Sequence, residues 1–132
     1  MPKKILVIDD EEILTKSFAM LLEKKGYEAY TARNGQDAQA LIEGEDIDLI
    51  ICDIRMPGQN GIATIVAIKQ AMEQQGKKGV PVIFVTGFAD ASLEGEAQKL
   101  KPLAYIFKPF DMQELLNIVI QGIGQSQRSE EP

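Results

Sequence analysis

The sequence predicts one α/β domain in which a parallel β-sheet is covered by helices on both faces. Apolar runs typical of buried strands alternate five times with segments whose apolar residues recur at helical spacing. The connections between them are short, as in repeated βαβ units. The chain of 132 residues shows no internal repeat, which fits one domain with a substantial core.

The first strand and helix follow from a change in hydrophobic period. Residues 4–8 begin with Lys4 and continue with four apolar residues, a run that is typical of a buried strand. The next large apolar residues recur at the spacing of one helical face, and they are Leu14, Phe18, Leu21 and Leu22. The helix should end at Gly26, because two lysines precede it and glycine favours the helix end.

The second strand, at residues 27–32, is shorter and less apolar than the first. We therefore expect it at an edge of the sheet. Asn34 is placed to cap the following helix, since its side chain can accept a bond from the first helical turn. That helix should end at Gly44 and bury Ala38, Leu41 and Ile42.

The third strand, at residues 47–53, is apolar until it ends in the carboxylate of Asp53. The Pro57-Gly58 pair that follows indicates a turn. The next helix is expected at 61–75, with four inward residues, Ile62, Ile65, Ile68 and Met72. A fourth strand at 81–85 begins with proline, where a missing N–H donor is tolerated.

The last strand and its flanking helices complete the pattern. A helix at 90–100 is weak, because it contains Gly95 and few large apolar residues, so it should shift at low cost. The fifth strand is expected at 103–107. Asp111, with Glu114 three residues later, indicates the start of a final helix that buries Leu115, Leu116, Val119 and Ile123. We place the domain at 1–124 and a polar tail or linker stub at 125–132.

Composition excludes several functions. The net charge of −6 argues against direct binding of nucleic acid through phosphate neutralisation. The absence of histidine excludes a Ser-His-Asp hydrolase, a His-ligated zinc site and phosphohistidine on this chain. The single cysteine, Cys52, excludes an internal disulfide, and we expect it in the core. The sequence has no signal-peptide pattern and no apolar run near the roughly 20 residues that span a bilayer. We therefore expect a cytoplasmic location and no membrane partner.

Polar side chains follow four of the five strands, namely Asp9 and Asp10, Asp53, Thr86, and Lys108. Each has an ordinary explanation when taken alone, as a helix-start acid, a turn residue or a loop residue. Because parallel strands have their carboxyl ends at one edge of the sheet, where open α/β sheets bind ligands, we expect these side chains to lie together.

The predicted cluster has a definite chemistry. Two carboxylates about 5 Å apart repel by roughly 3 kcal/mol at an effective dielectric constant near 20, so three of them need a cation. Oxygen ligands suit Mg²⁺, which leaves room for a phosphate. Lys108 can neutralise an incoming anion and Thr86 can donate a hydroxyl. This setting favours Asp53 as a nucleophile for phosphoryl transfer.

With these spacings, the chain resembles the receiver domain of two-component response regulators over residues 3–123. The residues that carry the resemblance are Asp9-Asp10, Asp53 with Met56-Pro57-Gly58 and Gly61, Val85-Thr86-Gly87, and Tyr105 with Lys108-Pro109-Phe110. The resemblance implies a doubly wound, flavodoxin-like (βα)5 fold, with a five-stranded parallel sheet in the order 2-1-3-4-5.

The resemblance also implies a role for each site residue. Asp53 is then the phosphoacceptor. Mg²⁺ is held by the carboxylates of Asp9, Asp10 and Asp53 and by the backbone carbonyl of Arg55. Lys108 contacts the phosphoryl group.

Two further residues are implied as a switch. Thr86 turns toward the phosphoryl group, and Tyr105 rotates into the space that Thr86 leaves, which changes the partner-binding surface along the weak helix. An ordinary amphipathic role with a solvated hydroxyl remains an alternative for Tyr105. The Lys108–Pro109 peptide bond is expected to be cis, as in similar domains.

The implied partners follow from the missing histidine. The phosphoryl donor must be external, and the resemblance points to a sensor histidine kinase or a histidine phosphotransfer protein. The output would be a downstream effector domain or protein, and the resemblance allows a dimer that forms on phosphorylation. The domain is then a signalling switch that assists its own phosphorylation and dephosphorylation, rather than an enzyme.

Two other functions are compatible with a sheet of this kind. A Mg²⁺-dependent phosphohydrolase with an aspartyl nucleophile usually has Asp-x-Asp after the first strand and a cap domain, whereas this chain has Asp9-Asp10 and no large insertion. A flavin carrier would need a hydroxyl- and glycine-rich loop where this chain has four acids. We also expect Arg55 and Phe88 to shield an acyl phosphate on Asp53 from water.

Overall fold

A five-stranded parallel sheet in the order β2-β1-β3-β6-β7 forms the centre of the molecule, and a two-stranded antiparallel hairpin, β4-β5, lies beside it. The computed structural model describes residues 2–56 and 58–130. The strands are β1 (Lys4–Ile8), β2 (Glu28–Ala32), β3 (Leu49–Asp53), β4 (Arg55–Met56), β5 (Gln59–Asn60), β6 (Val82–Thr86) and β7 (Ala104–Phe107). The helices are α1 (Glu12–Lys24), α2 (Gly35–Gly44), α3 (Gly61–Gln74), α4 (Ala91–Gln98) and α5 (Met112–Glu130).

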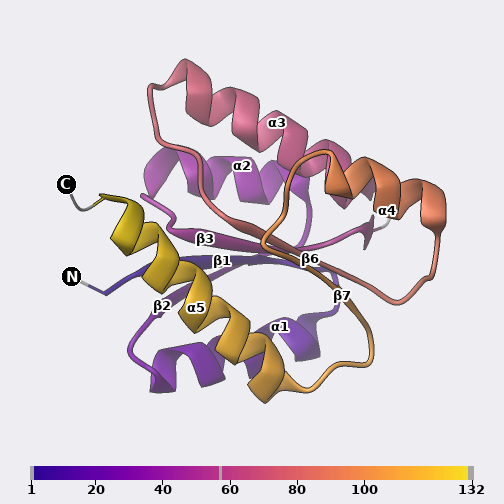
Figure 1. The fold of residues 1–132 in the computed structure, drawn as a ribbon, viewed down its shortest axis with the longest axis horizontal. Helices are drawn as coiled ribbons and strands as arrows, with labels where there is room; N and C mark the ends of the chain where they lie inside the picture. The colour runs from indigo at the N-terminus through magenta and orange to yellow at the C-terminus, as the bar shows by residue number, and fades with distance from the viewer. Residues whose placement is uncertain (1, 57, 131–132) are drawn as a thin grey trace.

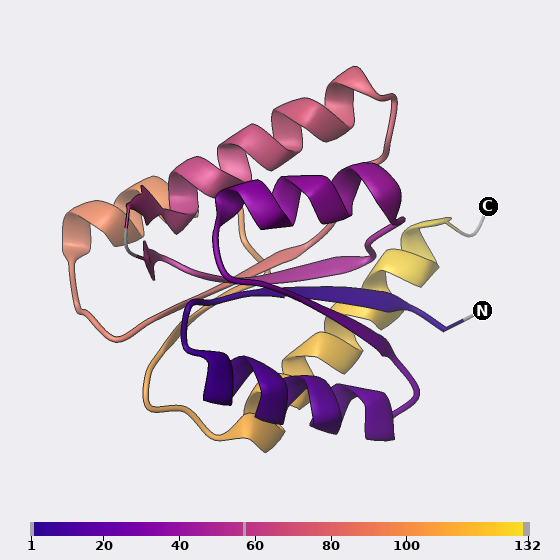
Figure 2. The ribbon, with the colours of Figure 1, turned by 180° about the vertical axis from the view of Figure 1, so that it is seen from behind.

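Helices cover both faces of the sheet. Figure 1 shows α1 and α5 on one face and α2, α3 and α4 on the other, and the reverse view in Figure 2 agrees. The order of the five strands corresponds to 2-1-3-4-5 when the hairpin is left out. The predicted doubly wound, flavodoxin-like fold is therefore confirmed.

The alternation of side chains along the strands creates two apolar cores. Leu6 and Ile8 of β1 face α2 and α3, whereas Ile5 and Val7 face α1 and α5. All residues of β3 and β6 are buried, because these strands lie inside the sheet and are covered on both faces. The less apolar β2 lies at one edge, as expected.

Local side-chain bonds fix the starts of three helices. The side chain of Asn34 accepts a hydrogen bond from the amide of Asp37 at 2.9 Å, which confirms the predicted cap of α2. Asn60 caps α3 and Asp90 caps α4 in the same way. The four expected inward residues of α3 are all buried, whereas Leu41 of α2 is only partly buried.

The structure departs from the expected elements at two places. Residues 55–56 and 59–60 pair as the hairpin β4-β5, and Gly58 between them has a positive φ of +78°. The last helix continues to Glu130, through six residues that we expected to be an aperiodic tail. Gln, Arg and Glu are good helix formers, so a polar segment without proline or glycine need not end a helix. The expected tail residues 131–132 lie outside the described part, and the division of the chain at 124 stays a prediction.

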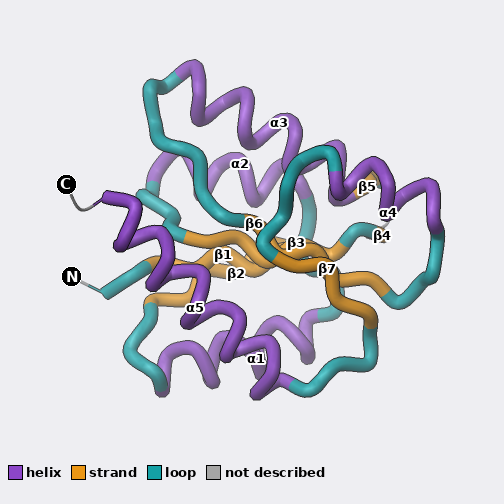
Figure 3. Tube along the Cα trace, viewed as in Figure 1, coloured by secondary structure: helices purple, strands orange, loops and turns teal. Residues whose placement is uncertain are grey.

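The parallel arrangement gathers functional loops at one edge. Figure 3 shows the loops after β1, β3, β6 and β7 on the side of the sheet opposite the start of β1 and the end of α5. In the described ranges, none of the helices combines the length and the apolar character needed to span a membrane.

Candidate functional site

Three carboxylates meet at the carboxyl edge of the sheet, as the sequence predicted. Asp53 ends β3, and Asp9 and Asp10 follow the neighbouring β1, where Ile8 pairs with Cys52. One carboxylate oxygen from each aspartate lies within 4.8 Å of the others. Asp9 and Asp53 are only 3% and 4% exposed, whereas Asp10 is partly buried.

Backbone amides orient the two buried aspartates. The amide of Glu11 donates to Asp9 Oδ1 at 2.9 Å, and the amide of Arg55 donates to Asp53 Oδ1 at 3.3 Å. In both cases the donor lies two residues after the acceptor, so the loop that follows each strand holds the carboxylate in place.

Lys108 joins the site from the loop after β7. Its Nζ donates to Asp9 Oδ2 at 3.0 Å and to Asp53 Oδ2 at 3.2 Å. Its backbone amide donates to the carbonyl of Thr86 at 2.7 Å, which fixes the start of the loop. The Lys108–Pro109 peptide bond is cis, as expected. The ammonium also binds Glu11 Oε1 at 3.0 Å, a partner that the sequence analysis did not identify.

The environment shifts two pKa values in this site. Burial and then the negative charge of Asp9 raise the pKa of Asp53 to about 6, although the ammonium of Lys108 partly opposes the shift. Burial alone would lower the pKa of Lys108, but its hydrogen bonds to Asp9 and Glu11 outweigh burial and raise it. Asp9 and Asp53 are thus two buried carboxylates that repel each other, and a bound cation would relieve this repulsion.

The donor set fits Mg²⁺. The cluster consists of three carboxylates and no nitrogen or sulfur ligand, which is the chemistry that this hard cation prefers. Within residues 2–56 and 58–130, the structure records no hydrogen bond or ion pair for the carboxylate of Asp10. Its oxygens are thus available to a metal ion.

Thr86 ends β6 and is 1% exposed. Its Oγ1 accepts a hydrogen bond from the amide of Phe88 at 3.2 Å, which leaves the hydroxyl hydrogen to donate to another partner. Tyr105 lies on the adjacent strand β7, opposite Phe84 in the register, and is partly buried against the apolar core on the α2 and α3 face.

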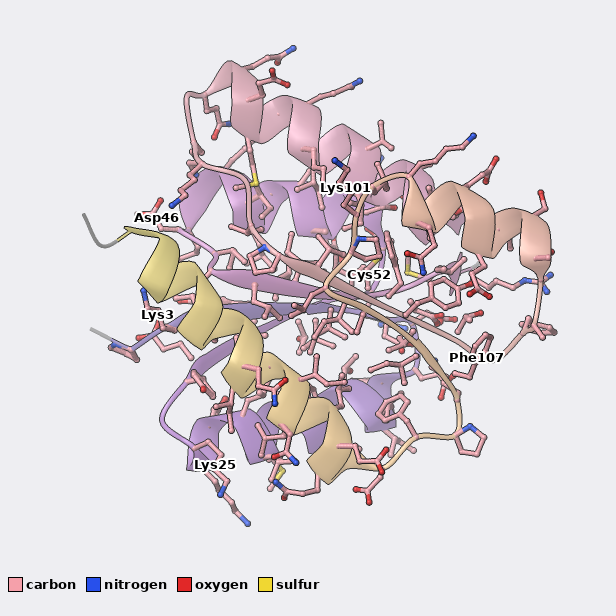
Figure 4. All side chains as sticks on the ribbon, viewed as in Figure 1. Lys3, Lys25, Asp46, Cys52, Lys101 and Phe107 are labelled. Carbon is pink, nitrogen blue, oxygen red and sulfur yellow. The ribbon has the colours of Figure 1, made fainter. Side chains whose placement is uncertain are left out.

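The ring of Tyr105 also has an aromatic neighbour on its own strand. It meets Phe107 edge to face, with 5.5 Å between the ring centroids and an interplanar angle of 71°. Phe107 is 44% exposed at the edge of the sheet (Figure 4). Burial, and then the charges of Glu94 and Asp90, raise the pKa of the Tyr105 hydroxyl. Tyr105 thus lies on the edge strand, with an acid of α4 and the acid that caps α4 near enough to act on its hydroxyl.

The carboxyl edge of the sheet also carries Arg55 and Phe88. The guanidinium carbon of Arg55 is 3.9 Å from the centroid of the Phe88 ring, and both residues are exposed. Sequence reasoning expected each of them near the site, but their mutual contact could not be read from either loop.

Cys52 and Gly61 both lie against the backbone carbonyl of Asp53. Cys52 is fully buried in the core on the α2 and α3 face, as predicted, and its Sγ donates to the carbonyl of Asp53 at 3.3 Å (Figure 4). Burial raises the pKa of its thiol. A Cβ at Gly61 would collide with the carbonyl oxygen of Asp53, so the first residue of α3 must be glycine for this close approach.

The fold and site define an open, doubly wound α/β protein with an acidic centre and one lysine at the carboxyl edge of its sheet. Residues 5–120 match the response regulator receiver domain, and the chain belongs to that family. Phosphoryl acceptance is general to the family, and its members generally bind Mg²⁺ at an acidic pocket. The match gives no support to the alternative of a phosphohydrolase.

Known proteins of the family share this architecture. The chain is 31% identical to the polar-differentiation response regulator DivK of Brucella anthropi, over 96% of this chain and all of that protein. It is 32% identical to the regulatory protein AtoC of Escherichia coli over 94% of this chain, but it spans only 26% of AtoC. The crystal structure of a CheY-like receiver domain protein from Methanospirillum hungatei has a TM-score of 0.86 at 27% identity, and the match covers 98% of this chain and 99% of that one.

Proposed function

We propose that Asp53 accepts a phosphoryl group from an external phosphohistidine donor, with the assistance of Mg²⁺. The observation that carries this proposal is the position of the Asp53 carboxylate, which is buried beside two further aspartates and 3.2 Å from the ammonium of Lys108. A nucleophilic carboxylate in contact with a fixed cation is suited to phosphoryl transfer.

Asp9, Asp10 and Asp53 would hold the metal ion through their carboxylates, and the backbone carbonyl of Arg55 would add a ligand. A bound Mg²⁺ supplies positive charge to the phosphoryl oxygens. The amides of Glu11 and Arg55 keep the carboxylates of Asp9 and Asp53 in fixed orientations, so little rearrangement is needed before the transfer.

The transfer itself exchanges one bond to phosphorus for another. An oxygen of Asp53 forms the new bond, the phosphorus–nitrogen bond of the donor breaks, and its electron pair stays on the imidazole nitrogen. Lys108 donates to a phosphoryl oxygen and offsets part of the added charge of about −1.5 to −2. The product is an acyl phosphate on Asp53.

The output would be a change of surface near β7 and α4. The hydroxyl of Thr86 can donate to a phosphoryl oxygen, and Tyr105 can then move into the space beside it. Only Ala97 of α4 is buried, so this helix can repack at low cost. Such a change would alter binding of a downstream effector domain or protein, and it could support a dimer of the phosphorylated form.

The domain acts as a switch, and partners supply the signal. A sensor histidine kinase or a histidine phosphotransfer protein is the proposed donor, because the chain has no histidine of its own. The charge of −6 argues against direct contact with nucleic acid. Residues 1–124 are the proposed receiver domain, with the segment from 125 as a link or tail.

Intact-mass measurement after incubation with acetyl phosphate and Mg²⁺ tests the chemistry. The wild type should gain one base-labile phosphoryl group, and Asp53→Asn should gain none. Asp46→Asn is the matched control, because Asp46 is an exposed acid whose only recorded contact in the described residues is a 3.9 Å ion pair with Lys77. A labelled Asp53→Asn protein, or an unlabelled wild type, would contradict the proposal.

The metal site has its own test. Mg²⁺ should stabilise the wild type against heat, by about 2.7 kcal/mol at a concentration near 100 times its dissociation constant. Asp10→Asn should lose most of this stabilisation, since it removes the most accessible carboxylate of the cluster. Equal stabilisation of both proteins would exclude a metal at this cluster.

A further inference from the structure

The ammonium of Lys108 has no spare donor. It carries three N–H groups, and the structure gives it three carboxylate partners: Asp9 at 3.0 Å, Glu11 at 3.0 Å and Asp53 at 3.2 Å. A phosphoryl oxygen can therefore accept a hydrogen bond from Lys108 only if one of these partners is displaced.

The three partners differ in how easily they can leave. The side chains of Asp9 and Asp53 are 3% and 5% exposed, so either could leave Lys108 only with another cation, such as the proposed metal ion, beside it. The side chain of Glu11 is 60% exposed and can exchange Lys108 for water. Ion pairs of exposed side chains are weak, because solvent screens them and compensates the separated charges.

The side chain of Glu11 also does not cap the helix that it precedes. It occupies the N-cap position of α1, yet it makes no side-chain cap bond. Short side chains such as Ser or Asp normally accept a bond from the first turn there. The Glu11 carboxylate instead reaches a lysine 97 positions later in the chain. Its backbone amide meanwhile stays bound to Asp9 Oδ1, so the carboxylate can leave without moving Asp9.

We propose that Glu11 is a place-holder for the phosphoryl group, which displaces it from Lys108 when Asp53 is modified. This inference rests on the proposed function of Asp53. Glu11 holds the ammonium over the cluster in the unmodified protein, and it competes with the phosphoryl group for the same donor. Its negative charge also repels the phosphoryl oxygens. Glu11 thus sets how readily the domain takes up and keeps a phosphoryl group.

Binding of trifluoroberyllate, a stable mimic of the phosphoryl group, tests this competition in the presence of Mg²⁺. Glu11→Gln keeps an oxygen that can accept from Lys108 but removes the charge, so it should bind the mimic about two- to fivefold more tightly than the wild type. Glu12→Gln is the matched control. Its carboxylate is equally close in sequence and also exposed, but it pairs with Lys16 at 3.0 Å rather than with Lys108.

The outcomes separate this inference from the proposed function. Tighter binding by Glu11→Gln, with Glu12→Gln equal to the wild type, supports the place-holder. A purely structural Glu11 would give equal or weaker binding in Glu11→Gln, and a simple charge effect would tighten both variants equally; either result overturns the inference while the proposed function stands. No binding by any of the three proteins would contradict the proposed function itself, and the inference with it.

Discussion

The guanidinium of Arg55 stacks on the ring of Phe88, with 3.9 Å between Cζ and the ring centroid. Arg55 lies two residues after Asp53, and Phe88 lies two residues after Thr86, so the contact links the loops that follow β3 and β6. A cation–π contact at an exposed position contributes about 0.5–1 kcal/mol, enough to restrain two otherwise mobile side chains.

We predict that this pair slows hydrolysis of the acyl phosphate. Phe88→Ala removes the ring and releases Arg55, so the phosphorylated protein should lose its phosphoryl group about two- to fivefold faster, the ratio that corresponds to the free energy of the contact. The decay can be followed by intact mass after removal of the donor. Phe107→Ala is the control, because Phe107 is another exposed phenylalanine, and its ring meets Tyr105 edge to face rather than Arg55. An unchanged decay in Phe88→Ala would refute the shielding role.

The raised pKa of Asp53 predicts a pH dependence of stability in metal-free buffer. The folded protein keeps the Asp53 proton up to about pH 6, whereas the unfolded chain releases it near pH 4. The protonated Asp53 carboxyl therefore makes its full contribution to the free energy of unfolding below pH 4, and this contribution is lost as the pH rises through 6. Asp53→Asn cannot ionise, so its advantage over the wild type should grow across this interval to about 1–2 kcal/mol, after allowance for solvent screening.

Urea unfolding between pH 4 and pH 7 in the presence of EDTA measures this difference. Glu12→Gln provides a comparison of opposite sign, because the hydrogen bond to Lys16 lowers the pKa of Glu12. The wild type should therefore be the more stable protein of that pair above the unfolded pKa, and its advantage should disappear in acid. A constant difference between Asp53→Asn and the wild type at all pH values would show that Asp53 does not titrate in this range.

Two glycine-to-alanine substitutions should have opposite effects. At Gly61 the new Cβ would collide with the carbonyl of Asp53, so we expect a loss of about 1–3 kcal/mol and slower phosphoryl uptake. At Gly95, inside α4, a Cβ meets no atom within 4 Å, so alanine should stabilise the protein by about 0.5–1 kcal/mol. Denaturant unfolding of both variants checks the contrast. Equal stabilities would mean that the loop before α3 adapts freely.

The proposed switch predicts a response at Tyr105 that depends on Thr86. Trifluoroberyllate and Mg²⁺ should shift the ring resonances of Tyr105 in NMR spectra, because the ring moves when the Thr86 hydroxyl turns to the mimic. Thr86→Ala should bind the mimic but lose most of this shift. The ring of Tyr30, on the edge strand β2, serves as the internal control. A full shift in Thr86→Ala would exclude the coupling.

Much of the fold could be predicted because its signals are local. The apolar runs fixed the five strands of the main sheet, and the polar character of residues 28–32 correctly placed β2 at an edge. Asn34 showed where α2 begins. The convergence of Asp9 and Asp53 also followed, because it depends only on the ends of neighbouring parallel strands.

The features that sequence reasoning missed depend on contacts between distant segments. Glu11 looked like one acid in an acidic loop, and only the fold brings Lys108 to it. The stacking of Phe88 on Arg55 likewise requires the relative positions of two loops. The hairpin β4-β5 was not predicted, because Gly58 indicates a turn but does not show which segments the turn joins.

The buried Cys52 offers a chemical reporter of local opening. It is the only cysteine in the sequence, it is fully buried, and it directly precedes Asp53 on β3. A thiol reagent can modify it only when this strand separates from its surroundings, so the alkylation rate measures the opening of the central sheet. Comparing this rate with and without trifluoroberyllate would show how strongly an event at the site stabilises the core beneath it.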